Sequence, residues 1–159
     1  MEEKRLFDIL KLYIAKYPSQ EVALAKKESG SWKKYSIQKY IEITNNISYA
    51  LIKLGIKKDD KVGIICNNRP EWNMLDMAIM QVGAITVPIY PTISKEDYHY
   101  IINDCEVKLI VLEGTGVLQK IESVKGPSNA ADLTLTLDII DQMKLSTTKA
   151  ADILIRDKQ

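Results

Sequence analysis

The feature that most constrains the fold is a pair of short apolar runs separated by a single helix-length segment. Residues 62–66 and 84–89 are the apolar runs, and residues 70–82 lie between them. Two buried strands joined through a helix of this length form a crossover connection, in which the strands pair in parallel. Pro70 suits the first position of the helix and Gly83 suits its end. The segment therefore predicts an α/β fold built on a parallel sheet.

The same pattern continues with a second helix and a third strand. Ser94 is an expected N-cap, and Asp97 follows it three residues later, as in a capping box with Asp in place of Glu. Residues 108–112 form the third apolar run. Because such crossovers are almost always right-handed, residues 61–113 are expected to form a three-stranded parallel β–α–β–α–β core of the doubly wound type.

A helix, a hairpin and a second helix are expected before the sheet, over residues 1–60. Apolar residues recur at three- and four-residue spacing over residues 6–17, which predicts an amphipathic helix that Pro18 ends. Residues 22–26 and 32–35 are short runs around a Ser-Gly pair, and they predict a β-hairpin.

The second of these helices is long, and the segment after the sheet is less regular. Ser36 caps the helix and Gly55 ends it. Its expected buried stripe consists of Tyr40, Ile43, Ile47, Leu51 and Leu54. In the C-terminal extension, residues 114–159, leucine alternates with threonine over residues 133–137, which predicts a strand with one buried face. Residues 139–145 and 148–157 are candidates for helices.

The composition is that of one globular domain and excludes some classes of function. With 22 basic and 21 acidic side chains, the net charge of +1 offers no electrostatic attraction to nucleic acid. The start, MEEKRLFDIL, lacks the apolar core of a signal peptide, and no run is long enough for a membrane span. A cytoplasmic location is expected, with Cys66 and Cys105 as free, buried thiols.

The places where a ligand could bind follow from the predicted topology. In open α/β sheets, ligands bind outside the carboxyl ends of the parallel strands. Here these ends are residues 67–69, 90–92 and 113–116. Tyr90 stands between two prolines, which fix the backbone on both sides. Its ring could form a rigid wall for a planar or apolar ligand, or it could pack on the edge of the sheet.

Other motifs predict no catalytic residue and no metal ligand. The Glu-Gly-Thr-Gly sequence at residues 113–116 lacks the third glycine of a dinucleotide loop and the Gly-Lys-Ser/Thr ending of a phosphate loop, so a tight turn is the preferred interpretation. His99, the single histidine, has no acid or cysteine at a spacing suited to a metal site or a catalytic pair. It is expected to be exposed or partly packed.

Several of these motifs, in their order and spacing, resemble the adenylate-forming (AMP-binding) superfamily. Residues 32–40, WKKYSIQKY, are similar to its first core motif, and residues 81–88, QVGAITVP, to its second. Pro-Glu-Trp at residues 70–72 and Pro-x-Tyr-Pro-Thr at residues 88–92 resemble the long-chain fatty acid–CoA ligase branch. The resemblance covers residues 32–112, about half of the chain.

The resemblance implies that residues 1–159 are one N-terminal subdomain of an enzyme that converts a fatty acid, ATP and coenzyme A into acyl-CoA, AMP and pyrophosphate, with Mg²⁺ bound to the phosphates. The family's phosphate loop, ribose-binding aspartate and C-terminal lysine have no counterpart here, so the chain alone is expected to be inactive. The resemblance also implies that Tyr90 and Thr92 lie along the coenzyme A path and that Lys120 lies near the nucleotide part of coenzyme A.

Two other classes of function stay open beside the ligase. One is a stand-alone nucleotide-binding module of Rossmann or flavodoxin type, which would bind at the same sheet edge but lacks the glycine fingerprint. The other is a non-catalytic interaction domain that uses an exposed apolar face. Peripheral contact with a membrane is compatible with the ligase interpretation.

Overall fold

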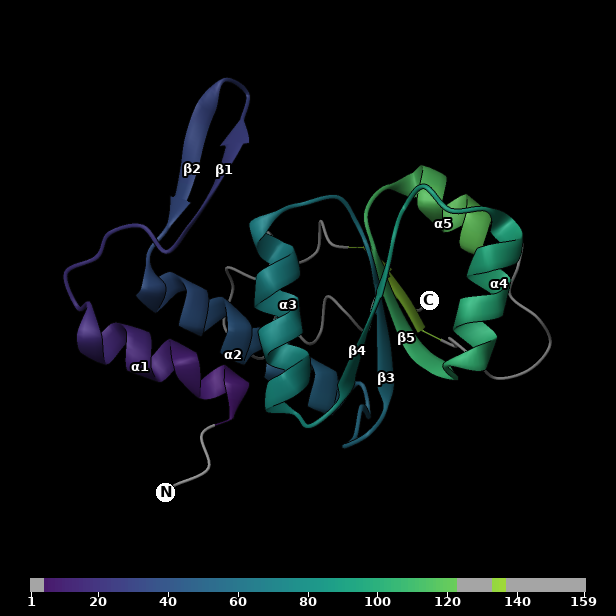
Figure 1. Cartoon of the computed structure of the whole chain (residues 1–159), viewed down its shortest axis with the longest axis horizontal. Coiled ribbons are helices and arrows are strands. Elements are labelled where there is room, and N and C mark those ends of the chain that lie inside the picture. Colours follow the sequence, from purple (N-terminus) through teal and green to yellow (C-terminus); the bar gives the residue numbers. More distant parts are fainter. Residues whose placement is uncertain (1–4, 123–132, 137–159) are drawn as a thin grey trace.

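The computed structural model of the chain describes residues 5–122 and residues 133–136. The N-terminal elements are η1 (Leu6–Asp8), α1 (Ile9–Lys16), β1 (Leu24–Glu28), β2 (Ser31–Tyr35) and α2 (Ile37–Lys53). They are followed by β3 (Lys61–Ile65), α3 (Pro70–Gln81), β4 (Ile85–Ile89), α4 (Lys95–Asp104), β5 (Val107–Leu112), α5 (Thr115–Glu122) and β6 (Leu133–Thr136). This order confirms the predicted helix–hairpin–helix segment and the β–α–β–α–β series (Figure 1).

The centre of the fold is a parallel sheet with the strand order β4-β3-β5-β6. The three predicted strands form it together with β6, which pairs with β5. The strand predicted over residues 133–137 is therefore the fourth strand of the sheet. The helices predicted over residues 139–145 and 148–157 lie outside the described residues.

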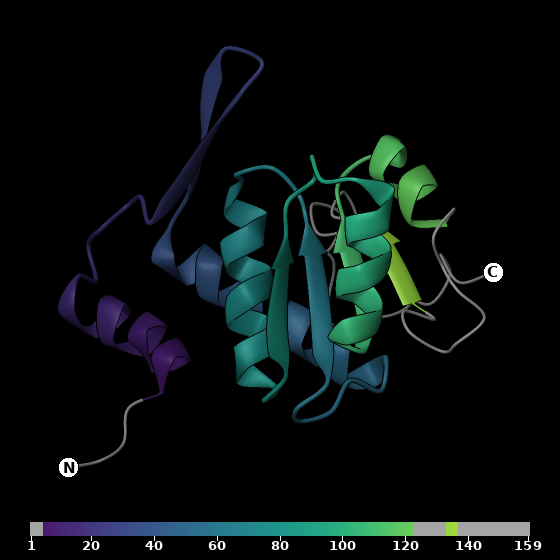
Figure 2. The same ribbon diagram turned by 45° about the vertical axis from the view of Figure 1, so that its right-hand side comes forward.

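Helices cover both faces of the sheet, as the doubly wound prediction requires. Val62 and Ile64 of β3 belong to a buried cluster with α2 and α3, whereas Ile65 of the same strand belongs to a second cluster with α4 and α5. Figures 1 and 2 show these two pairs of helices on opposite sides of the strands. β3 and β5 are buried on both faces, which is why they read as continuous apolar runs. The prediction of a buried strand over residues 84–89 is wrong in part, because β4 is the edge strand of the sheet and Ile85 is 46% exposed.

The strand order determines where the topological switch point of the sheet lies. The chain runs from β3 through α3 to β4 on one side, and then crosses back over β3 through α4 to reach β5 on the other side. The connections thus diverge between β3 and β5, whose carboxyl ends form the topological switch point at which open α/β sheets bind ligands. Residues 67–69 leave β3 there, and Glu113 leaves β5.

The hairpin β1–β2 extends away from the helices and the sheet in Figures 1 and 2. Its strands are antiparallel, with Leu24 opposite Tyr35. Ser29 and Gly30 form the connecting turn with φ angles of 49° and 84°. Positive φ at both central residues matches the twist of a two-residue hairpin, so the predicted hairpin is confirmed, with its first strand starting at Leu24 rather than at residue 22.

The ends of the helices follow the predicted local signals. Ser36 accepts a hydrogen bond from the first turn of α2, Ser94 forms the predicted capping box of α4, and Pro70 is the first residue of α3. Gly55 and Gly83 follow α2 and α3 with φ angles of 82° and 76°. These left-handed conformations favour glycine, and they end both helices where the sequence indicated.

The helix predicted over residues 6–17 is confirmed as η1 and α1, but most of its apolar residues are not buried. Among those residues, only Leu10 of α1 is buried, and Leu6 and Ile9 are exposed. The reason is that the helix joins the core through Leu10, Tyr13 and Ile14, which leaves the side with Ile9 outside. The apolar periodicity located the helix but did not determine which side faces the core.

The long helix α2 buries the stripe that its periodicity predicts, whereas α3 buries a broader surface. The buried members of the predicted α2 stripe are Tyr40, Ile43, Ile47 and Leu51. The buried residues of α3 are Pro70, Glu71, Met74, Leu75, Ala78 and Ile79. Trp72 of α3 and Val82 at its C-terminal end are only half-buried, whereas contact with both α2 and β4 buries two neighbouring sides of the helix. Within the described residues, no helix is long and apolar enough to cross a membrane.

Candidate functional site

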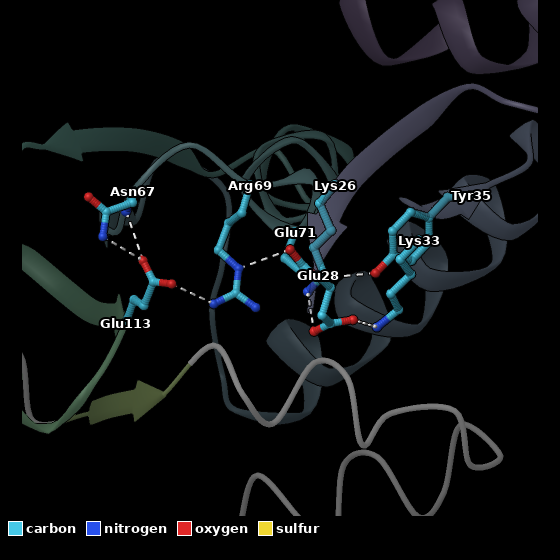
Figure 3. A network of polar contacts seen from close by, with 8 residues as sticks. All are labelled: Lys26, Glu28, Lys33, Tyr35, Asn67, Arg69, Glu71 and Glu113. Carbon is cyan, nitrogen blue, oxygen red and sulfur yellow. Dashed lines mark hydrogen bonds and ion pairs between the residues drawn. The ribbon is translucent and has the colours of Figure 1, made fainter. Parts of the chain in front are cut away.

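A chain of charged side chains joins the hairpin to the carboxyl edge of the sheet (Figure 3). Glu71, in the first turn of α3, accepts hydrogen bonds from Lys26 Nζ at 2.8 Å and from the Tyr35 hydroxyl at 3.1 Å. Its other oxygen accepts from Arg69 Nε at 2.9 Å. Arg69 Nη1 then donates to Glu113 Oε1 at 2.9 Å. Both strands of the hairpin are thereby tied to the residues at the switch point.

Glu71 is the centre of this network and is ionised at neutral pH. Its side chain is only 1% exposed. Burial by itself raises the pKa of a carboxyl, but the hydrogen bonds from Arg69 and Lys26 outweigh it and bring the pKa of Glu71 down to about 2. The sequence indicated an acid at the helix start but not this role, since Lys26 and Tyr35 are 45 and 36 residues away along the chain.

Glu113 binds the loop that follows β3 and so connects the two strand ends at the switch point. Its Oε2 accepts from the backbone N–H of Asn67 at 2.9 Å and from Asn67 Nδ2 at 3.1 Å. Gly114 follows with a φ of 78°, which confirms the expected tight turn, whereas Gly116 lies in the first turn of α5. The two predicted strand ends, 67–69 and 113–116, are thus in direct contact.

A hollow of about 460 Å³ opens beside this loop. It is lined by Cys66, Asn67, Asn68, Trp72, Pro88, Ile89, Tyr90, Pro91 and Thr92. Tyr90 is 79% exposed, so it does not pack on the edge of the sheet. Its backbone is nevertheless held, because the hydroxyl of Tyr98, a buried residue of α4, donates to the Tyr90 carbonyl at 3.1 Å.

The predicted site residues therefore fall into two groups. Tyr90 and Thr92 lie together on the hollow. Lys120 is half-buried in α5, and it is not among the residues that line the hollow. Asn67 and Asn68 belong to the predicted strand end 67–69 but were not named as site residues, and the contribution of Trp72 was missed. Their Asn-Asn-Arg-Pro-Glu-Trp sequence at a strand end was a usable signal.

A second, larger hollow of about 900 Å³ lies between the hairpin and the start of α3. Its lining includes Trp32, Lys27, Asn68 and Trp72, together with charged members of the network such as Arg69. Asn68 lines both hollows and so stands between them. The carboxylates of Glu71 and Glu113 are both engaged by cations, so neither is an unpartnered general base.

Comparison with known proteins decides the family. A family model described as AMP-binding enzyme matches residues 11–156. The chain belongs to the AMP-binding enzyme family. The match extends beyond the predicted motifs at both ends, and it agrees with the resemblance seen in residues 32–112.

Individual members of the AMP-binding family support this assignment. Fatty acyl-CoA synthetase A of Dictyostelium discoideum is 37% identical over 103 residues, which cover 65% of this chain and 15% of that protein. Long-chain-fatty-acid–CoA ligase ACSBG2 of Xenopus laevis is 38% identical over 104 residues, which cover 65% of this chain and 14% of the relative. The chain thus spans a small part of the length of these relatives.

A solved structure shows the same fold. The N-terminal domain of FACL13 from Mycobacterium tuberculosis superposes with a TM-score of 0.77 at 18% sequence identity. The superposition covers 89% of this chain and 36% of that domain. This chain and that N-terminal domain therefore share the α/β fold.

The described residues were also compared with the requirements of a metal site. No group of three or more His, Cys, Asp or Glu side chains lies close enough there to hold a metal ion. His99 is exposed on α4, as expected, and its ring Nδ1 lies 3.2 Å from Asn103 Nδ2.

Cys66 lines the smaller hollow, and its thiol is expected to be unreactive. Cys66 and Cys105 are free, but both are half-buried rather than fully buried as predicted, because each lies just past the end of a strand or helix. Burial raises the pKa of the Cys66 thiol to about 12, and the nearby Glu113 carboxylate adds to the increase. A thiol attacks only as its thiolate, so Cys66 stays protonated and weakly nucleophilic near neutral pH.

The expected result is slow alkylation of Cys66 by iodoacetamide in a Cys105→Ser background. Because burial raises the pKa from an ordinary 9.0 to about 12, we expect the folded chain to react at least about tenfold more slowly than the same chain in denaturant, the loss of thiolate being partly offset by its higher nucleophilicity. Mass spectrometry over time measures both rates. Equal rates in the folded and unfolded chain would contradict the assigned environment.

Proposed function

We propose that this chain is part of a long-chain fatty acid–CoA ligase, which converts a fatty acid, ATP and coenzyme A into acyl-CoA, AMP and pyrophosphate. The observation that carries the proposal is the similarity to the two relatives from Dictyostelium and Xenopus, whose names give this activity. The family match favours the ligase over a stand-alone nucleotide-binding module or a non-catalytic interaction domain.

The proposed reaction has two balanced steps. An oxygen of the fatty carboxylate attacks the α-phosphorus of ATP, and pyrophosphate leaves to give the acyl-adenylate. The thiolate of coenzyme A then attacks the acyl carbon, and AMP leaves to give the thioester. Because the chain lacks a phosphate loop and its described part lacks a carboxylate cluster, we propose that ATP and Mg²⁺ bind elsewhere in the ligase and that this chain alone is inactive.

We propose that the smaller hollow forms part of the coenzyme A path. The exposed ring of Tyr90 is suited to stacking, and Thr92 and Asn67 bring polar groups to the same wall. Lys120 is the cation that we propose for the phosphates at the nucleotide end of coenzyme A. The protonated state of Cys66 supports this use, since a neutral thiol does not compete with coenzyme A for the activated acyl group.

Two assays on the whole ligase test the proposal. Fatty-acid-dependent exchange of pyrophosphate into ATP reports the first step and needs no coenzyme A, whereas thioester formation reports the second. Tyr90→Ala and Lys120→Ala are each expected to raise the KM for coenzyme A about tenfold, the effect of losing roughly 1.4 kcal/mol of binding free energy.

Tyr100→Ala is the matched control, because Tyr100 is also an exposed tyrosine (66%) but lies on α4, away from the hollow. Its KM for coenzyme A should stay at the wild-type value. Absence of fatty-acid-dependent exchange in the wild-type ligase would refute the proposed function. An unchanged KM in both Tyr90→Ala and Lys120→Ala would refute only the assigned path.

We also propose a cytoplasmic location. Support comes from the two cysteines, which are free, as is usual in a reducing compartment. Peripheral contact with a membrane is part of the same proposal, since long-chain fatty acids partition into lipid, and the exposed Leu6 and Ile9 offer apolar surface near the N-terminus.

A further inference from the structure

We propose that Glu113 is a positioning residue for Asn67, and that it turns the side-chain oxygen of Asn67 into a hydrogen-bond acceptor for the bound coenzyme A. This inference rests on the proposed function. It concerns Asn67, a lining residue of the smaller hollow that the resemblance to the family did not include.

The first observation is that the Glu113 carboxylate takes the place of a backbone carbonyl as hydrogen-bond acceptor at the end of the sheet. The Glu113 N–H donates to the Ile65 carbonyl at 2.9 Å, which continues the β3–β5 ladder by one bond. In a regular parallel ladder, the next bond would run from the Asn67 N–H to the Glu113 carbonyl. Here the Glu113 carboxylate accepts from that N–H instead. The chain can therefore turn at Gly114 while the start of the 67–69 loop remains held.

The second observation is that the same carboxylate sets the orientation of the Asn67 amide. An ionised carboxylate only accepts hydrogen bonds, so the amide group that faces it must be the NH₂. Asn67 Nδ2 donates to Glu113 Oε2 at 3.1 Å, and Figure 3 shows the amide oxygen on the side away from Glu113. Asn67 is one of the residues that line the hollow, and with its NH₂ group engaged by Glu113, its oxygen is the amide atom proposed to accept from a ligand.

The third observation is that Glu113 is itself held. Its second oxygen accepts from Arg69 Nη1 at 2.9 Å, and Arg69 Nε is bound to the buried Glu71. The loop is therefore fixed at Asn67 and at Arg69 through one side chain. A carboxylate with both oxygens engaged has little rotational freedom, which suits a residue that orients another.

These contacts indicate which chemical group of a ligand Asn67 recognises. A fixed amide oxygen binds an N–H or O–H donor and rejects a second acceptor. Coenzyme A carries such donors in the two amide N–H groups of its pantetheine arm. We infer that Asn67 accepts from this arm and that Glu113 acts on coenzyme A through Asn67.

The test uses the whole ligase and compares the KM for coenzyme A with the rate of pyrophosphate exchange. Glu113→Ala and Asn67→Ala should each raise the KM about five- to tenfold, as expected for one lost hydrogen bond, while exchange stays within about twofold. The double variant should match either single variant, because both changes remove the same interaction. Glu113→Gln, which keeps an acceptor for Asn67, should restore most of the affinity.

Glu106→Gln is the control, because Glu106 is an exposed acid next to the opposite end of β5. It should leave both measurements unchanged. Additive effects in the double variant would overturn the inference, and so would a parallel loss of exchange and of coenzyme A affinity in Glu113→Ala, which would indicate a purely structural role. If the wild-type ligase shows no fatty-acid-dependent exchange, the proposed function fails independently of these variants.

Discussion

Glu71→Ala is expected to lower the free energy of unfolding by about 3–5 kcal/mol, the range for removing one partner of a buried ion pair. Glu71 is the shared partner of Arg69 and Lys26, neither of which is well exposed, and it also accepts from the buried Tyr35. Removing the carboxylate takes away a negative partner of two largely buried cations, Arg69 and Lys26. It also weakens the contact between the hairpin and α3. Urea unfolding of the 159-residue chain, followed by circular dichroism, measures the effect.

Glu42→Ala is the matched control for this substitution. Glu42 also pairs with a lysine, Lys39, but on the exposed surface of α2. Exposed pairs of this kind contribute about 0.2–1 kcal/mol, so the control should change the unfolding free energy much less. Comparable small effects of both substitutions would contradict the assignment of Glu71 as the centre of the network.

The contribution of Glu71 to the free energy of unfolding should fall as the pH falls. The pKa of Glu71 is about 2 in the folded chain, below its ordinary value of 4.5. The unfolded chain therefore binds the proton more readily, and the stabilisation by Glu71 is complete above pH 4.5. It should be lost as the pH falls from there toward 2. The difference in stability between the wild type and Glu71→Gln should shrink over that interval, and a constant difference would contradict the assigned pKa.

Tyr98→Ala is expected to destabilise the chain by about 3–5 kcal/mol, as for other buried aromatic residues replaced by alanine. Tyr98 is fully buried in the cluster on the α4 and α5 side of the sheet, and its hydroxyl holds the Tyr90 carbonyl. The substitution therefore opens a cavity and also releases the backbone of Tyr90. Thermal and urea unfolding of the purified chain measure the loss.

Two neighbouring variants separate the causes of this loss. Tyr98→Phe keeps the ring and removes only the hydrogen bond to Tyr90, which should cost about 1 kcal/mol. Tyr100→Ala changes an exposed tyrosine two residues away on the same helix, and surface substitutions usually stay within about 0.5 kcal/mol. An effect of Tyr98→Ala no larger than that of Tyr100→Ala would disprove the burial of Tyr98.

The elements that sequence analysis predicted well have local causes. Serine caps, glycine ends and Pro70 act within one turn of a helix, and the apolar runs of β3 and β5 reflect strands covered on both faces. Sequence analysis predicted less well which side of each helix faces the core. Apolar periodicity locates α1 but not its contact with the core, and α3 buries an acid that no hydrophobic pattern would select.

The sequence by itself determined the class of fold, the resemblance to the family and the edge of the sheet at which we propose that a ligand binds. Each of these follows from short-range patterns, namely strand and helix signals in order and motifs at fixed spacing. Only the tertiary structure decided which side chains meet at that edge. Glu71 joins Lys26 and Tyr35, and Glu113 joins Asn67, through contacts that span 36 to 46 residues. The physical reason is that such pairs depend on the packing of the hairpin and strands in space, which spacing along the chain does not encode.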